Sequence, residues 1–313
     1  MYRVTLAVSA FLLVSAMASR QVCGQTASQP VPSERIPPPE LHGGIEISPR
    51  VVRAIALRIA ESAEGNNIKV LFSYSLPLTS PVLSKDGRLT PDYIRATTLT
   101  VQKAFQQLQQ QYRVPENQIH ILGLSDFTAQ NVEELRAEIS DKTGRPAIFV
   151  NAETETELSI AGIIPRRYRA GGRTFDNRNI SMLLDLGSAS MRGGYQQLKT
   201  RAQGAPEYEF VTWEVPKGTA SFATEVAAAA GETADLSTYA RRAQAVGGTS
   251  VRNLIQTEIA RKPALLSRKK VYLTGGIVWA MMTLLHPEDQ SNFATITMED
   301  INNFHTRATV DPE

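Results

Sequence analysis

Residues 183–195 read LLDLGSASMRGGY, an apolar run that ends in one acid and continues into a cluster of glycine and serine. A carboxylate at the end of an apolar strand has to be paired, hydrated or bound to a ligand, because an unpaired buried charge is costly. Two interpretations fit. Either Asp185 caps its own turn in a β-hairpin, or the loop after it binds phosphate, since short side chains let backbone N–H groups approach phosphate oxygens.

The segments around this stretch alternate between strand and helix patterns. Thr90-Pro91 has the pattern of a helix cap and first turn, and apolar residues then recur at helical spacing as far as Tyr112. Strands are expected at residues 119–122, 147–150, 182–186, 209–215 and 270–273, and helices at residues 131–140, 153–160, 222–230, 251–261 and 278–285. Strands separated by helices predict an α/β fold with largely parallel central strands.

Residues 44–63 contain two conflicting patterns. Ser48 as a cap, Pro49 in a first turn and a late Gly65 favour a helix. A different pattern favours a hairpin instead, namely Ile45-Glu46-Ile47 before a turn, followed by Arg53, Ile55, Leu57 and Ile59 on alternate positions. On the local pattern alone, the helix is slightly favoured.

The N-terminus has the pattern of a secretory signal peptide, residues 1–24. Arg3 supplies the positive charge, residues 4–16 are apolar, and this run is too short for a typical membrane span. Cleavage after Ala18 and cleavage after Gly24 both fit the pattern. We therefore expect a periplasmic or secreted protein.

A proline-rich linker is expected at residues 25–42, with the folded part beginning near Gly43. Cys23 is the single cysteine, which excludes an internal disulfide framework and cysteine-based metal clusters. Arg20-Gln21-Val22 before it makes a poor lipobox, so a lipoprotein is disfavoured.

Composition and motifs narrow the class of function. The chain has 33 Lys and Arg against 31 Asp and Glu, a net charge of +2, which gives no global argument for binding nucleic acid or an anionic membrane. The 4 histidines lack zinc-site spacing, and neither a Gly-x-Ser-x-Gly elbow nor a Walker sequence occurs. The sequence therefore gives no support to three classes of enzyme, namely serine hydrolases, zinc hydrolases and P-loop enzymes.

An ordered series of motifs resembles the exopolyphosphatase/guanosine pentaphosphatase (Ppx/GppA) family of the actin-like ATPase superfamily. The motifs are GIEISPRVV (44–52), DGRLTPDYI (86–94), HILGLSDFT (120–128), TETELSIAGI (154–163), DLGSASM (185–191), VPKGTASF (215–222) and VYLTGGIVWAM (271–281). The resemblance implies two actin-like, ribonuclease H-like α/β domains, residues 43–178 and 179–313, with a ligand cleft between them.

The same resemblance implies roles for individual residues. Glu155 matches the carboxylate that positions or deprotonates the attacking water, and Asp185 and Glu46 match the acids that hold Mg²⁺. The expected phosphate-binding residues are Gly187, Ser188, Ser190 and Arg50.

The chain also departs from the family pattern. The first loop reads Ser48-Pro49-Arg50-Val51 where the family has Gly-Ser-Asn-Ser, so that Pro49 removes an N–H. The family continues well past the segment that ends here at Glu313, which predicts an incomplete or compact second domain. The loop between residues 162 and 180 carries a group of arginines that suits a polyanion, although a basic surface loop without a ligand is commoner. They are Arg166, Arg167, Arg169, Arg173 and Arg178.

Two classes of function remain open. The first is a Mg²⁺-dependent hydrolase that releases terminal phosphate from polyphosphate or a related polyphosphorylated substrate, and it is slightly favoured. The second is a noncatalytic relative that binds polyphosphate, nucleotide or a protein partner. No specific nucleic-acid partner is expected, membrane contact is expected only through the signal peptide, and a homodimer stays open.

Overall fold

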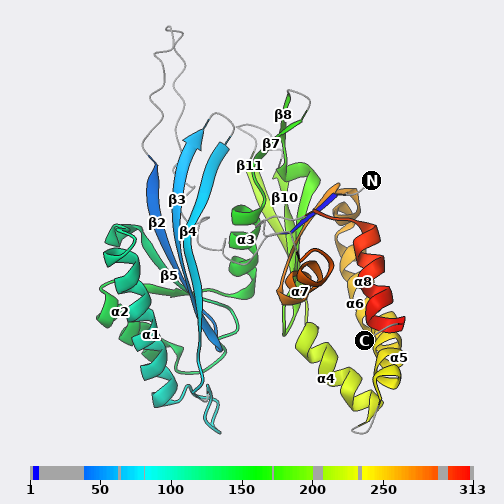
Figure 1. Cartoon of the computed structure of the whole chain (residues 1–313), viewed down its shortest axis with the longest axis horizontal. Helices are drawn as coiled ribbons and strands as arrows, with labels where there is room; N and C mark the ends of the chain where they lie inside the picture. Colours follow the sequence, from blue (N-terminus) through cyan, green and yellow to red (C-terminus); the bar gives the residue numbers. More distant parts are fainter. Residues whose placement is uncertain are drawn as a thin grey trace. The chain divides into compact units, whose positions relative to one another are not determined.

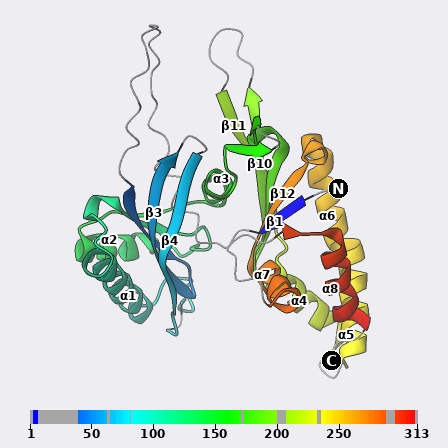
Figure 2. The same ribbon diagram turned by 45° about the horizontal axis from the view of Figure 1, so that its top comes forward.

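The computed structural model describes residues 3–6, 39–62, 65–80, 82–170, 173–199, 207–231, 235–287 and 295–310. Its contacts divide the chain after Leu158 (Figures 1 and 2). We call the described residues from 39 to Leu158 the N-terminal unit. The C-terminal unit comprises the residues from Ser159 onward together with the strand Arg3–Leu6.

The N-terminal unit is a five-stranded sheet in the order β4-β3-β2-β5-β6. Its first three strands form an antiparallel meander, and β5 and β6 continue the sheet parallel to β2. The strands are β2 (Glu40–Ile47), β3 (Val51–Ser62), β4 (Gly65–Pro77), β5 (Ile119–Gly123) and β6 (Ala147–Phe149). The helices are α1 (Pro91–Gln110), α2 (Val132–Thr143) and α3 (Ala152–Ile163), whose last turn passes into the C-terminal unit.

The core of the N-terminal unit lies between its sheet and helices α1 and α2, which cover one face (Figure 1). Thr90 caps α1 as the sequence predicts, because its hydroxyl accepts the N–H of Tyr93 at 3.2 Å. Tyr93 and Leu108 of α1 pack against Ile45 and Ile121 of the sheet, and all four are almost fully buried.

The C-terminal unit has a six-stranded sheet in the order β11-β10-β9-β12-β1-β13, again with an antiparallel meander followed by a parallel strand. The strands are β1 (Arg3–Leu6), β9 (Ser181–Leu186), β10 (Met191–Lys199), β11 (Glu207–Val215), β12 (Lys270–Thr274) and β13 (Thr295–Ile296). The helices are α4 (Thr219–Ala230), α5 (Leu236–Val246), α6 (Arg252–Arg261), α7 (Gly276–Leu285) and α8 (Met298–Val310). β7 (Arg167–Ala170) and β8 (Arg173–Asp176) form a separate hairpin.

The two units therefore repeat one α/β plan. In both, a three-stranded meander has its first strand at the centre of the sheet, beside a parallel strand. The helix expected within residues 44–63 is wrong, because these residues form the hairpin of β2 and β3. The Ser48 hydroxyl does accept a backbone N–H, but that N–H belongs to Val51 and closes a turn.

The N-terminal region is described only in part. The predicted cleavage points, Cys23 and most of the linker at residues 25–42 lie outside the described residues. Arg3–Leu6 pairs in parallel with β12 and antiparallel with β13, so removal of a signal peptide would also remove this strand. No helix in the described ranges combines the length and the apolar character needed to cross a bilayer.

Candidate functional site

The first strand-end acid, Glu46, is buried and ion-paired. It lies directly opposite Arg53 in the register of β2 and β3, and the Arg53 Nη1 atom donates to its Oε1 at 2.7 Å. The Glu46 side chain is 5% exposed and that of Arg53 is 43% exposed. The charge expected to hold a metal is thus neutralised by an arginine of the same hairpin.

The first loop uses most of its own hydrogen-bonding groups. The Ser48 N–H donates to the Val51 carbonyl at 2.9 Å, and the Val51 N–H donates to the Ser48 hydroxyl at 3.2 Å. Pro49 has no N–H to offer. The Arg50 carbonyl accepts the Leu78 N–H, and the Arg50 side chain is exposed. This closed turn is a poor phosphate cradle.

Glu155 lies at the same edge of the N-terminal sheet as the end of β2. The Leu124 N–H extends the β2–β5 ladder by donating to the Ile47 carbonyl at 2.9 Å. The next residue, Ser125, donates its N–H to the Glu155 Oε2 atom, also at 2.9 Å. Because Asn151 caps α3 through the N–H of Thr154 at 2.8 Å, the first turn holds the Glu155 carboxylate against this loop.

Asp185 ends β9 in the C-terminal unit. Its Oδ1 atom accepts the Thr274 hydroxyl at 2.7 Å from the neighbouring strand β12. On its other side, Asp185 faces Arg192 of β10 in register, which brings their side chains to the same face of the sheet. Arg192 also donates through its Nε atom to Glu214 of β11 at 2.9 Å and is only 13% exposed. Asp185 is therefore not an isolated carboxylate.

Close backbone packing shapes the loop after Asp185. A Cβ atom on Gly275, where φ is +107°, would lie 2.2 Å from the Leu186 carbonyl oxygen, and one on Gly218 would lie 2.5 Å from the Ser188 carbonyl carbon. The Gly187 and Ser188 carbonyls accept the first N–H groups of α4. Only glycine permits these approaches.

The tip of this loop has free donors. Among the hydrogen bonds of the described residues, none uses the N–H of Ser188 or of Ala189, and both residues are exposed. The loop is also a hairpin connection between β9 and β10, so the two interpretations of the DLGSAS sequence are compatible. A turn with two free N–H groups at a strand end can accommodate an anion.

Ser190, another expected ligand, and the neighbouring Lys217 both have partners within the unit. Ser190 is buried, and its hydroxyl hydrogen-bonds the Glu214 carboxylate. Burial raises the pKa of Glu214, but the hydrogen bonds from Ser190 and Arg192 outweigh burial and lower it. Lys217 of the VPKGTASF motif pairs with Glu225. These groups support the loop from within the unit.

The arginine-rich loop forms the β7–β8 hairpin and the turn after it. Arg178 pairs with Asp176 at 2.7 Å and stacks on the Tyr208 ring at 3.6 Å. Burial raises the pKa of Asp176, but hydrogen bonds from Arg178 and Tyr208 outweigh burial and bring the pKa to about 2. Arg178 therefore has an internal partner, while Arg166, Arg167 and Arg173 are exposed.

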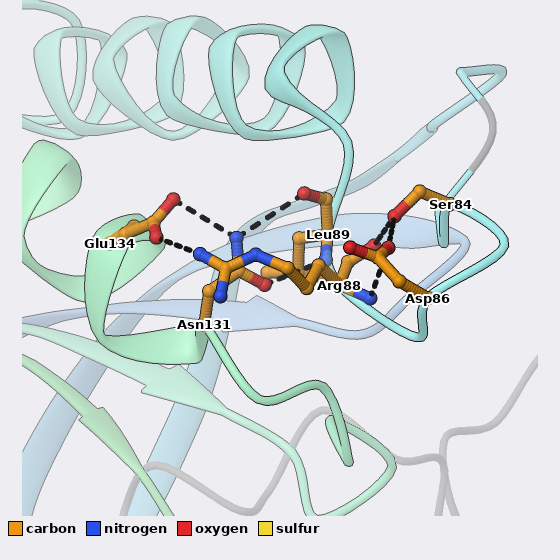
Figure 3. A network of polar contacts seen from close by, with 6 residues as sticks. All are labelled: Ser84, Asp86, Arg88, Leu89, Asn131 and Glu134. Carbon is orange, nitrogen blue, oxygen red and sulfur yellow. Dashed lines mark hydrogen bonds and ion pairs between the residues drawn. The ribbon is translucent and has the colours of Figure 1, made fainter.

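The DGRLTPDYI motif has a structural role in the N-terminal unit (Figure 3). Buried Asn131 at the start of α2 accepts the Leu89 N–H at 2.7 Å and donates to the Leu89 carbonyl at 3.3 Å. Asn131 also donates to Glu134, which pairs with Arg88, and Asp86 accepts the Ser84 hydroxyl. The network fixes the turn that precedes α1.

Within its own unit, Glu46 is a poor ligand for Mg²⁺. Mg²⁺ needs carboxylate oxygens that are open to it, and an adjacent guanidinium repels it. Within the described ranges, no group of three or more His, Cys, Asp or Glu could hold a metal ion. Sequence reasoning missed Arg53 and Arg192, although each follows its acid by seven positions in the printed sequence.

The expected convergence of the three acids stays a prediction. Glu46 and Glu155 meet the same edge of one sheet, whereas Asp185 belongs to the C-terminal unit. The roles assigned to these residues by resemblance are likewise untested by the geometry within each unit.

Comparison with solved structures identifies the fold. The chain is similar to the Aquifex aeolicus Ppx/GppA family member at 13% identity and TM-score 0.55, over 81% of this chain and 72% of that one. A crystal structure of the type II variant of the Aquifex aeolicus Ppx/GppA phosphatase gives 15% identity and TM-score 0.55, over 85% and 79%. This chain has the fold of the Ppx/GppA phosphatases.

Further comparison agrees with the Ppx/GppA fold. An exopolyphosphatase-like protein matches at 17% identity and TM-score 0.51, over 79% of this chain and 69% of that one. No family model matches the sequence, and no curated protein matches it. The likeness therefore lies in the three-dimensional structure, and it shows the fold alone.

Proposed function

We propose that this protein binds a polyphosphorylated ligand, polyphosphate or a related compound, at the loop that follows Asp185. The observation that carries the proposal is the exposed tip of this loop, where the N–H groups of Ser188 and Ala189 have no partner among the described residues. Backbone N–H groups at such a turn suit phosphate oxygens. The Ppx/GppA fold supports the same ligand class.

The N-terminal unit argues for binding rather than turnover. Its first loop is closed by the hydrogen bonds between Ser48 and Val51, and Glu46 is neutralised by Arg53. Phosphoryl transfer depends on charge stabilisation around the transferred group. In the first hairpin, the groups that match this machinery are engaged with one another, which favours binding.

Hydrolysis of the terminal phosphoanhydride is the second candidate, favoured by the position of Glu155. The Ser125 N–H orients its carboxylate at a strand edge, which is how a group that positions water is held. The signal-peptide pattern adds the proposal that the protein works in the periplasm or outside the cell, where polyphosphate is a better candidate ligand than ATP.

Thermal unfolding with and without long-chain polyphosphate tests the binding proposal. We expect polyphosphate to raise the Tm of the wild type and not that of Ala189→Asp, because the new carboxylate repels the ligand. Ala228→Asp, on an exposed face of α4, is the matched control and keeps the shift. An unchanged Tm in the wild type, or an equal shift in all three proteins, contradicts the proposal.

Phosphate release separates the two candidates. With Mg²⁺ and polyphosphate, a wild type that binds without releasing phosphate supports the noncatalytic function. A wild type that releases phosphate, together with a Glu155→Gln variant that binds but does not release it, establishes hydrolysis instead.

A further inference from the structure

The hairpin of β7 and β8 carries a positive charge that the proposed function does not use. Residues 166–178 contain five arginines and a single acid, Asp176. The hairpin forms a two-stranded sheet of its own, separate from the six-stranded sheet of the C-terminal unit (Figure 1). Since the whole chain has a net charge of only +2, the excess of positive charge is a local feature of this hairpin.

The base of the hairpin is anchored to the body of the unit. The Asn177 N–H donates to the Arg166 carbonyl at 3.0 Å, and the buried Asn177 side chain donates to the Tyr272 hydroxyl at 2.9 Å. Tyr208 of β11 donates its hydroxyl to Asp176 at 2.7 Å. These contacts hold the hairpin in a defined position relative to β11 and β12.

The single acid of the hairpin is already neutralised. Burial raises the pKa of Asp176, but hydrogen bonds, chiefly from Arg178, outweigh burial and bring the pKa to about 2. Three other arginines are exposed, namely Arg166, Arg167 and Arg173, and no carboxylate of the described residues pairs with them. Their guanidinium groups can therefore bind an external anion.

A large apolar side chain is exposed within the same segment. Phe175 of β8 is 40% exposed. An aromatic ring gains little from a hydrated polyanion, whereas it leaves water when it enters the interface of a bilayer. Single-stranded nucleic acid can use both arginine and aromatic groups, but the signal-peptide pattern directs the chain to a membrane. The combination favours an anionic lipid surface.

We propose that the β7–β8 hairpin docks the protein on an anionic lipid surface. Arg166, Arg167 and Arg173 bind the phosphate groups of acidic lipids, and Phe175 enters the interface between headgroups and acyl chains. Each basic residue at such a surface strengthens binding about 5-fold, so that three give about 100-fold. This contact is separate from the proposed polyphosphate site, because the hairpin precedes β9 and the loop follows it.

Cosedimentation of the whole protein with lipid vesicles tests the docking. We expect the wild type to bind vesicles of equal parts phosphatidylglycerol and phosphatidylcholine more tightly than vesicles of phosphatidylcholine alone, and salt to reduce the difference. The triple variant Arg166→Gln, Arg167→Gln, Arg173→Gln should lose about 100-fold in affinity for the acidic vesicles. Equal binding of the wild type to the two kinds of vesicle overturns the inference.

A second triple variant controls for net charge. Arg242→Gln, Arg252→Gln and Arg307→Gln remove the same charge from exposed positions on α5, α6 and α8 of the same unit, and should leave the affinity unchanged. All three proteins keep the apolar residues near the N-terminus, so any binding through these residues is the same in each. An equal loss of affinity in the two triple variants contradicts the role of the hairpin.

Variants of Phe175 test the apolar part of the contact. Phe175→Ala should weaken binding to the acidic vesicles about 5-fold, because the ring no longer leaves water. Phe175→Trp should keep the affinity, since tryptophan also favours the bilayer interface. Unchanged vesicle binding by Phe175→Ala overturns the inference. So does a single-stranded oligonucleotide that binds through the three arginines when acidic vesicles do not.

Discussion

Replacing Gly275 by alanine should destabilise the C-terminal unit strongly. The new Cβ atom would lie 2.2 Å from the Leu186 carbonyl oxygen and 2.7 Å from its carbon, at a φ of +107°. This backbone conformation costs a residue with a side chain on the order of 1–3 kcal/mol, and relieving an overpacked contact costs about 1–3 kcal/mol more. We therefore expect a loss of about 4 kcal/mol, or roughly 10 °C in Tm for a unit of this size.

The adjacent Gly276 provides the control. A Cβ atom there meets nothing within 4 Å, and Gly276 begins α7, where alanine is a better helix former by up to about 1 kcal/mol. Calorimetric unfolding should show a low Tm for Gly275→Ala and an unchanged or slightly raised Tm for Gly276→Ala. Equal Tm values for the two variants would refute the packing of Gly275 against the strand that carries Asp185.

Three further predictions concern stability. Burial lowers the pKa of His120 from its ordinary 6.5, so stability falls as the pH drops below about 6.5, by up to about 1.4 kcal/mol per pH unit; His120→Gln should flatten that dependence in urea unfolding. Burial raises the pKa of Asp176, but hydrogen bonds from Arg178 outweigh burial and bring the pKa to about 2. The ionised carboxylate therefore stabilises the fold above about pH 4, and this stabilisation is lost as the pH falls toward 2. Since Asp176 is about one-third exposed, Asp176→Asn should cost no more than about 1 kcal/mol at pH 7 and nothing at pH 2, by the same unfolding assay. Ser48→Ala should cost about 1 kcal/mol in urea unfolding at pH 7, because the Val51 N–H loses its acceptor, and no measurable cost would contradict the closed turn.

The sequence predicted the helices and parallel strands well because their signals are local. Thr90-Pro91 begins α1, the apolar spacing that follows is buried, and the strands at residues 119–122 and 270–273 lie inside the two sheets, each beside the first strand of a meander. The strand β4 and the helix α5 were not expected. β4 reads GNNIKVLFSYSLP, whose polar residues obscure a strand that pairs with β3 and packs Leu71, Phe72 and Tyr74 against the core.

The wrong helix at residues 44–63 shows where local signals fail. Ser-Pro is equally suited to a helix start and to a tight turn, since both use the serine oxygen as an acceptor. The alternation of apolar residues beyond Arg53 was the better signal, because it reflects the two faces of a sheet. Here the tertiary pairing with β2 and β4 decided the structure.

The candidate site was predictable in its position but not in its electrostatics. The DLGSAS sequence marks the loop, whereas the position of Arg192 opposite Asp185 depends on the register of β9 and β10. The same holds for Glu46, whose partner is set by the length of the turn after β2. The spacing of residues along the chain does not determine the register of β9 with β10 or of β2 with β3, so both had to come from the structure.

Amide chemical shifts test the central claim most directly. In ¹H–¹⁵N spectra of the deuterated protein in EDTA, titration with tripolyphosphate should shift the Ser188 and Ala189 signals in a saturable way, because their N–H groups bind the ligand. The Ser48 and Val51 signals should stay in place, since their N–H groups are already bonded within the turn. Unchanged Ser188 and Ala189 signals at saturation would contradict the account.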